Sequence, residues 1–172
     1  MFLDECGFSL SLYRLYGWVI GGGRCEENVP FNKGTNRSVV GAFSLPRETN
    51  PTGMLALWQK DGAWNKLQFE CFVEIAVLPF VPKGSVLVLD NARIHHNPSL
   101  TAAVEKAGCS LLYLPPYSPD FSPIELAWSW IKAYVRNLGP RERDTRIEAI
   151  YAAADALPPQ HALKWFQHCG LC

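Results

Sequence analysis

The sequence predicts one α/β domain built around a mixed sheet, and two observations support this. Strand-like segments come first, a strand-helix-strand unit follows, and helical segments close the chain, which is the element order of an α/β domain with a mixed sheet. The length of 172 residues suits one domain with one core. Hydrophobic residues make up 48% and charged residues 19%, which is typical of a folded protein and excludes a disordered one.

Five segments have the composition of strands, and together they predict a five-stranded sheet. The first three are Met1–Glu5, Tyr13–Ile20 and Ser38–Leu45. Ser85–Leu89 is continuously apolar, which favours a strand buried on both faces of a mixed or parallel sheet. Cys109–Leu114 is a second short apolar strand, and prolines end it.

Five segments have helical spacing, so helices are expected to flank the sheet. In the first, Trp64–Leu78, the apolar residues at helical spacing are Leu67, Cys71, Phe72, Ile75 and Leu78. Proline or glycine ends several of the segments. The remaining four are Pro98–Ala107, Ile124–Leu138, Asp144–Ala156 and His161–Phe166.

Charge and cysteine content limit the partners and the compartment. The formal net charge is zero, so any contact with DNA must come from local clusters. No apolar run approaches the roughly 20 residues of a membrane span, so no membrane partner is expected. Six scattered cysteines lack the spacing of a disulfide framework and predict a reducing cytoplasm. Cys169 and Cys172 form one pair, whereas structural zinc normally needs two.

Asp90 follows the buried strand directly, at the end of the sheet where open α/β folds place their chemistry. The alternative is that its carboxylate only caps the turn by accepting from a backbone N–H two residues on. A phosphatase with an aspartate nucleophile usually has a second Asp two residues later, but here that residue is Ala92.

Glu125 lies in the first turn of a predicted helix. Its alternative role is a capping box, in which Ser122 is the N-cap and Glu125 bonds back to the Ser122 amide. Steps of three and four from Glu125 reach Ser129, Lys132 and Arg136, which predict either a stripe along a phosphate backbone or a solvated helix face. Asp120 is the rival acid, although a proline-rich loop positions it less firmly.

Asp4 completes a possible triad, because a first strand, a buried strand and a helix start can converge at one end of a sheet. Alternation places Asp4 on the face of Phe2 and opposite Glu5. Three close carboxylates repel each other unless cations neutralise them, and hard oxygen ligands suit Mg²⁺ or Mn²⁺. Two such ions can stabilise both the attacking and the leaving oxygens of a phosphoryl displacement.

Three blocks of sequence resemble the D-D-E transposases of the mariner superfamily, and the resemblance runs over essentially the whole chain. Between the second and third acids lie 34 residues, which is the spacing of one bacterial insertion-sequence branch. The third block is the most specific because it matches over twelve residues. The blocks are Leu3–Phe8, Val88–Ala92 with His95, and Leu114–Glu125 with Trp128 and Lys132.

The resemblance implies a ribonuclease H-like fold for residues 1–172, with Asp4, Asp90 and Glu125 as catalytic metal ligands for two Mg²⁺ ions, which Mn²⁺ can replace. It implies Asn91 and His95 as supports of the second acid. Arg93, Lys132 and Arg136 are the candidate contacts to DNA. The activity implied is cut-and-paste transposition, in which the element's inverted-repeat ends are cut and joined to target DNA, commonly at TA.

Relatives carry a helix-turn-helix region ahead of the first acid, and this chain begins three residues before Asp4. The expectation is therefore that an upstream reading frame supplies that region, and that an active homodimer works at the bacterial nucleoid. Two other hypotheses stay open. One is an inactive remnant or a module that binds DNA or a partner, and the other is a different ribonuclease H-like nuclease.

Overall fold

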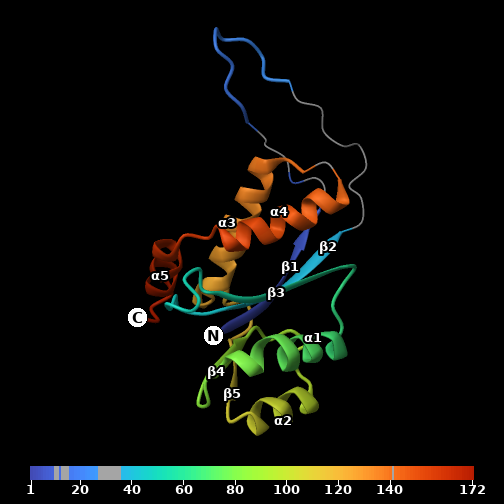
Figure 1. Ribbon diagram of the computed structural model, residues 1–172, viewed down its shortest axis with the longest axis vertical. Coiled ribbons are helices and arrows are strands. Elements are labelled where there is room, and N and C mark those ends of the chain that lie inside the picture. The colour runs from blue at the N-terminus through green and yellow to red at the C-terminus, as the bar shows by residue number, and fades with distance from the viewer. Residues whose placement is uncertain (10–11, 13–15, 27–35, 141) are drawn as a thin grey trace.

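A mixed five-stranded sheet with the order β3-β2-β1-β4-β5 forms the centre of the computed structural model (Figure 1). The structure describes residues 1–9, 12, 16–26, 36–140 and 142–172. β1 (Phe2–Phe8) pairs antiparallel with β2 (Arg37–Phe43), and β2 pairs antiparallel with β3 (Met54–Asp61). On its other side β1 pairs in parallel with β4 (Val86–Leu89), and β4 with β5 (Ser110–Tyr113).

Helices cover both faces of the sheet, which gives three layers (Figure 1). One face carries α1 (Lys66–Phe72), which continues as a π-helix (Val73–Val77) and a 3-10 turn (Leu78–Phe80), and α2 (Pro98–Lys106). The other face carries α3 (Pro123–Leu138), α4 (Arg143–Asp155) and α5 (Pro159–His168), and a 3-10 turn (Pro119–Phe121) precedes α3. No helix in the described part of the chain is long and apolar enough to cross a membrane.

Strand alternation divides the core between the two faces. Phe2, Cys6 and Phe8 of β1 pack with α3, α4 and α5, whereas Leu3 packs with α1 and α2. Both clusters consist of fully buried side chains, so the central strand is fixed from above and below. This matters for the site, because residues next to each other on β1 must face different layers.

Most of the predicted elements are confirmed. The buried strand, the strand after it and the four later helices start and end within two residues of the predicted positions. The α/β class with a mixed sheet is therefore correct. β1 extends three residues further than predicted, to Phe8.

One predicted strand is wrong. Residues 16–20 form no strand, and residues 13–15 of the same prediction lie outside the described part. Tyr16, Trp18 and Ile20 are almost fully exposed, so no sheet or core holds them. The fifth strand is instead β3, whose eight residues are all half-buried and lack the alternation that marks a strand in sequence.

The first helix exists, but its buried face differs from the predicted one. Leu67 and Ile75 are 72% and 61% exposed, while Phe69, Phe72 and Val73 are buried. The two phenylalanine rings remove more apolar surface from water than a leucine and a cysteine would, so they decide which side packs. The π-helical turn then continues with Val77 facing the core.

Candidate active site

Asp4, Asp90 and Glu125 line one cavity of about 420 Å³. They come from the middle of β1, from the residue after β4 and from the first turn of α3. Leu3 of β1 pairs in parallel with Leu89 of β4. The residue that follows each of them is an acid, so this register brings Asp4 beside Asp90. The three acids that the sequence singles out therefore line one cavity next to the end of β4.

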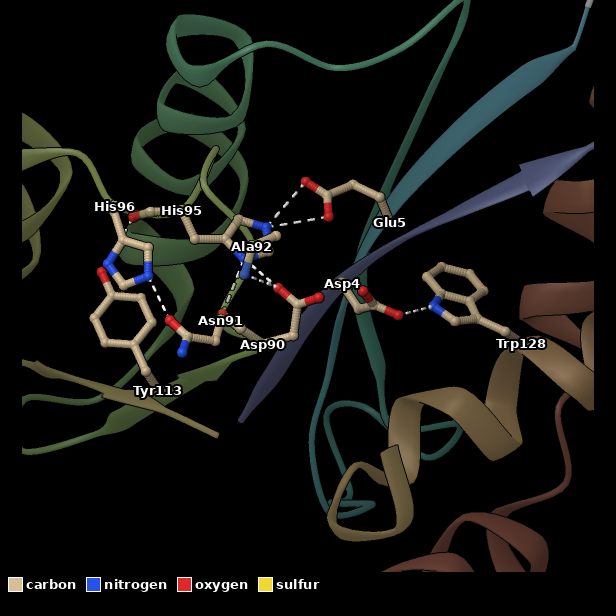
Figure 2. Close-up of polar contacts among 9 residues, drawn as sticks. All are labelled: Asp4, Glu5, Asp90, Asn91, Ala92, His95, His96, Tyr113 and Trp128. Carbon is tan, nitrogen blue, oxygen red and sulfur yellow. Dashed lines mark hydrogen bonds and ion pairs between the residues drawn. The ribbon is translucent and has the colours of Figure 1, made fainter. Parts of the chain in front are cut away.

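Asp4 is held from the α3 side by Trp128. The indole Nε1–H of Trp128 donates to Asp4 Oδ2 at 3.0 Å (Figure 2), and Trp128 itself is buried. Gly41, the β2 residue opposite Asp4, makes room for this contact. A Cβ on Gly41 would lie 2.6 Å from the Trp128 ring, so only glycine lets the ring approach the strand this closely.

The pKa of Asp4 is raised to about 7. Burial is the largest cause, and the negative charges of Glu125, Glu5 and Asp90 add to it. The neutral indole supplies a hydrogen bond but no positive charge. Asp4 therefore faces two other carboxylates across the cavity without a cationic partner of its own among the described residues.

The pKa of Asp90 shifts in the opposite direction, downward. Its Oδ1 lies 2.7 Å from Nδ1 of His95 and accepts from the backbone N–H of Ala92 at 2.9 Å. The hydrogen bond from His95 is the main reason that the pKa of Asp90 is lowered; burial opposes it and the Ala92 N–H supports it. Asp90 thus caps its turn, as the alternative interpretation held, while it also faces the cavity.

His95 is fully buried between two carboxylates (Figure 2). Its Nε2 lies 3.1 and 3.2 Å from the two carboxylate oxygens of Glu5, and its ring packs on Phe69 with centroids 4.5 Å apart. Burial alone would lower the pKa of His95, but the hydrogen bonds to Asp90 and Glu5 outweigh it and raise that pKa to about 10. His95 is therefore a cation near neutral pH.

Glu125 does not form the capping box that was its alternative role. Ser122 is the N-cap of α3 but makes no side-chain capping bond, and only the backbone N–H of Glu125 bonds to the Ser122 carbonyl. The Glu125 carboxylate is exposed and faces the cavity. The rival acid Asp120 does not line the cavity. It lies near Cys169 instead, where burial is the main cause that raises the pKa of the thiol and the negative charge of Asp120 adds to it.

The other predicted site residues lie around the cavity rather than in its centre. Asn91 lines it, and its side-chain oxygen lies 2.6 Å from Nε2 of His96. Lys132 points its ammonium over the Phe8 ring at 5.9 Å. Neither Lys132 nor Arg136 nor the exposed Arg93 lines the cavity.

The basic cluster after α3 belongs partly to the fold. Arg143 pairs with Asp61 at 2.5 Å, Arg37 pairs with the same carboxylate at 3.1 Å, and Arg146 is buried. Arg141 lies outside the described residues. Arg143 therefore contributes to the fold through its ion pair with Asp61.

The sequence did not single out three residues that shape the site. Glu5 and Gly41 carry no motif signal of their own, and their roles depend on strand register. Tyr117 lines the cavity, is fully exposed and has a φ of 58°, the only positive φ outside glycine among the described residues. A tyrosine between prolines could have drawn attention to this turn.

The donor set fits a hard divalent cation, whereas the spacing is not that of a closed metal site. Three carboxylates and no soft ligand line the cavity. Burial and, after it, the repulsion between carboxylates raise the pKa of Asp4, and a cation would relieve both. Within the described residues, however, no three His, Cys, Asp or Glu side chains lie close enough together to hold one ion. The acids would have to close around it.

Comparisons with known proteins agree on one family and one fold. A family model described as DDE superfamily endonuclease matches residues 1–147. No curated protein matched the sequence. Solved structures that match include several of Mos1, among them the Mos1 mariner paired end complex with Mn (TM-score 0.70, 15% identity, 99% of this chain and 51% of that one).

Two further Mos1 structures give the same fold. They are the paired end complex with Mg (TM-score 0.64, 15% identity, 99% and 53% coverage) and the transposase catalytic domain with Raltegravir and Mg (0.61, 11%, 98% and 80%). The chain spans about half the length of the first two structures. The ribonuclease H-like fold predicted from the resemblance is confirmed.

Proposed function

The chain belongs to the DDE superfamily endonucleases, and from that premise we propose that it is the catalytic domain of a transposase that cuts and joins DNA in cut-and-paste transposition. The observation that carries this proposal is the meeting of Asp4, Asp90 and Glu125 in one cavity from three separate elements. The Mos1 structures with Mn and Mg support a dependence on divalent metal.

Asp4, Asp90 and Glu125 would hold the metal, two Mg²⁺ ions or Mn²⁺ in their place. Bound there, the ions supply stabilisation of the attacking and leaving oxygens of the phosphodiester. The chain's own part is to orient the ligands. Trp128 donates to one oxygen of Asp4, and His95 and Ala92 donate to one oxygen of Asp90, so both carboxylates are oriented at the cavity that they line.

The DNA that the site acts on is the inverted-repeat end of the element and then a target, commonly a TA site. Solved Mos1 structures include a pre-cleavage transpososome, a strand transfer complex and a paired-end complex with the left transposon end, which supports DNA as the partner. We place the chain in the bacterial insertion-sequence branch because 34 residues separate Asp90 from Glu125. A homodimer at the nucleoid, with a helix-turn-helix region from an upstream frame, completes the proposal.

A cleavage and strand-transfer assay with Mn²⁺ tests this function. The substrate is duplex DNA that carries the inverted repeats flanking the gene, and the joining step is followed with pre-cut ends. Glu125→Gln should reduce both reactions by about 10³-fold, since it removes a charged ligand worth several kcal/mol in the transition state. Asp120→Asn, a change of one carboxylate outside the cavity, is the matched control and should leave them unchanged.

Three results would contradict the proposal. Equal loss in Asp120→Asn would move the third acid to the loop. Preferred cleavage of an RNA–DNA hybrid would favour another ribonuclease H-like nuclease. Absence of any metal-dependent reaction in the wild-type chain, together with carboxylate-independent DNA binding, would favour an inactive or purely binding module.

A further inference from the structure

Two neighbouring acids of β1 point to opposite sides of the sheet. Asp4 faces the cavity and Trp128, while Glu5 faces the α1 layer and does not line the cavity. The Glu5 side chain is only 19% exposed, which is unusual for a glutamate without a charged partner. Its partner is His95, ninety residues further along the chain.

His95 joins Glu5 to Asp90. Each ring nitrogen faces a carboxylate, Nδ1 at 2.7 Å from Asp90 Oδ1 and Nε2 at 3.1 Å from Glu5 Oε2. Nδ1 also lies 3.2 Å from the backbone oxygen of Asp90, so the ring is held at both ends by oxygen atoms. Because the ring is fully buried against Phe69, it has no water with which to replace either contact.

The consequence falls on the orientation of Asp90. Its Oδ1 is occupied by the Ala92 N–H and by His95, and its second oxygen lies on the side of Asp4 (Figure 2). Asp90 itself is 56% exposed, so without these two contacts its side chain would turn freely in solvent. Its fixed orientation thus depends on the buried side of the sheet.

We propose that Glu5 is a positioning residue, which holds the buried His95 ring in place between two carboxylates and so directs Asp90 toward the cavity. The inference rests on the proposed function, because it assigns Glu5 a part in holding the same ions. Without Glu5, the buried Nε2–H would lose its acceptor, and His95 would no longer be fixed between the two acids. Supports of this kind typically change metal affinity by about 10 to 100-fold.

The dissociation constant for Mn²⁺, measured by calorimetry at fixed pH, tests the role of Glu5 without relying on activity. Glu5→Met removes the acceptor but keeps the length of an unbranched side chain, and it should weaken Mn²⁺ binding by about 10 to 100-fold. Glu5→Gln keeps one acceptor oxygen and should recover most of the affinity. Glu74→Met, an exposed glutamate on the α1 side, is the matched control and should bind as the wild type does. Circular dichroism checks that each variant is folded.

A double-mutant cycle with His95→Gln shows whether Glu5 acts through the histidine. If it does, Glu5→Met adds less than about twofold once His95 is replaced. Additive effects, or Glu5→Met binding within twofold of the wild type, would overturn the inference. If the wild type binds Mn²⁺, Glu5→Met weakens that binding and the wild type still cleaves no DNA, the proposed function is contradicted but the role of Glu5 is not. No Mn²⁺ binding by the wild type would overturn both.

Discussion

The two central acids are held from opposite layers of the sheet by different kinds of donor. On the α3 side a neutral indole, Trp128, holds Asp4, and the pKa of that acid rises to about 7. On the α1 side a charged imidazolium, His95, holds Asp90, and the pKa of Asp90 is lowered. One sheet therefore carries two adjacent carboxylates, one short of positive charge and one supplied with it.

This difference shows what the cavity lacks. Hydrogen bonding alone orients Asp4 but leaves it repelled by Glu125 and Asp90. A divalent cation between the acids would supply the positive charge that Asp4 lacks, whereas Asp90 already has a charged partner in His95. The Asp90 side is therefore expected to contribute more to folding, and the Asp4 side to respond more strongly to pH and metal.

Loss of His95 should be the most damaging single change to the fold. His95→Ala leaves the partly buried Glu5 carboxylate unpaired and opens a cavity against Phe69, so the free energy of unfolding should fall by about 3 kcal/mol. Urea denaturation at neutral pH measures it. His96→Ala is the control, because His96 is exposed, stacks on Tyr113 and contacts Asn91 but forms no ion pair with a carboxylate among the described residues; an equal effect there would refute the special role of His95.

Replacement of Asp4 should stabilise the metal-free protein. Because the folded-state pKa of Asp4 lies above its ordinary value of 3.8, ionising it costs stability as pH rises from about 4 to about 7. The full shift corresponds to about 4 kcal/mol, and screening in the open cavity reduces it to about 2 kcal/mol. Asp4→Asn should therefore be more stable than the wild type at pH 8 and equal to it near pH 4.

The measurement is the difference in unfolding free energy between Asp4→Asn and wild type at several pH values, with a chelator present. The exposed Asp120→Asn serves as the control for a lost charge. A stability difference that does not change with pH would show that Asp4 is not strained by its neighbours. With Mn²⁺ added, the order should reverse, because the wild type alone keeps the full set of ligands.

The smallest effect is expected from the hydrogen bond between Trp128 and Asp4. Trp128→Phe leaves a cavity in the core and also removes the indole donor at 3.0 Å, and the part of the loss that belongs to the hydrogen bond should be about 1 kcal/mol. The loss should be largest at pH 8, where Asp4 is ionised. Chemical denaturation of Trp128→Phe and of the double variant with Asp4→Asn measures the coupling, and a coupling of zero would mean that the hydrogen bond contributes nothing.

Local signals in the sequence were sufficient for much of the fold. β4, β5 and α2 are bounded by Pro, Gly and Asn, and the stripe of α3 is regular, so these elements were predicted almost residue by residue. β3 was missed because all its residues are half-buried, so no period of two appears. The face of α1 was wrong because two apolar stripes compete there, and only packing decides between them.

The site was predictable only in part. The three acids and His95 could be identified from motif blocks, whereas the partners of those residues could not. Glu5 reaches His95, and Trp128 reaches Asp4, across separations of 90 and 124 residues, which depend on register and on layer order. Gly41 becomes meaningful only when Trp128 lies over it. Sequence spacing alone carries none of this information.

Anomalous diffraction from Mn²⁺-soaked crystals tests the central claim most directly. We expect Mn²⁺ in the cavity with oxygen ligands from Asp4, Asp90 and Glu125, which have moved together, while the contacts of Trp128 and His95 to their acids stay in place. Manganese found elsewhere, or no manganese in the cavity at saturating concentration, would contradict the assignment of these three carboxylates as the metal-binding triad.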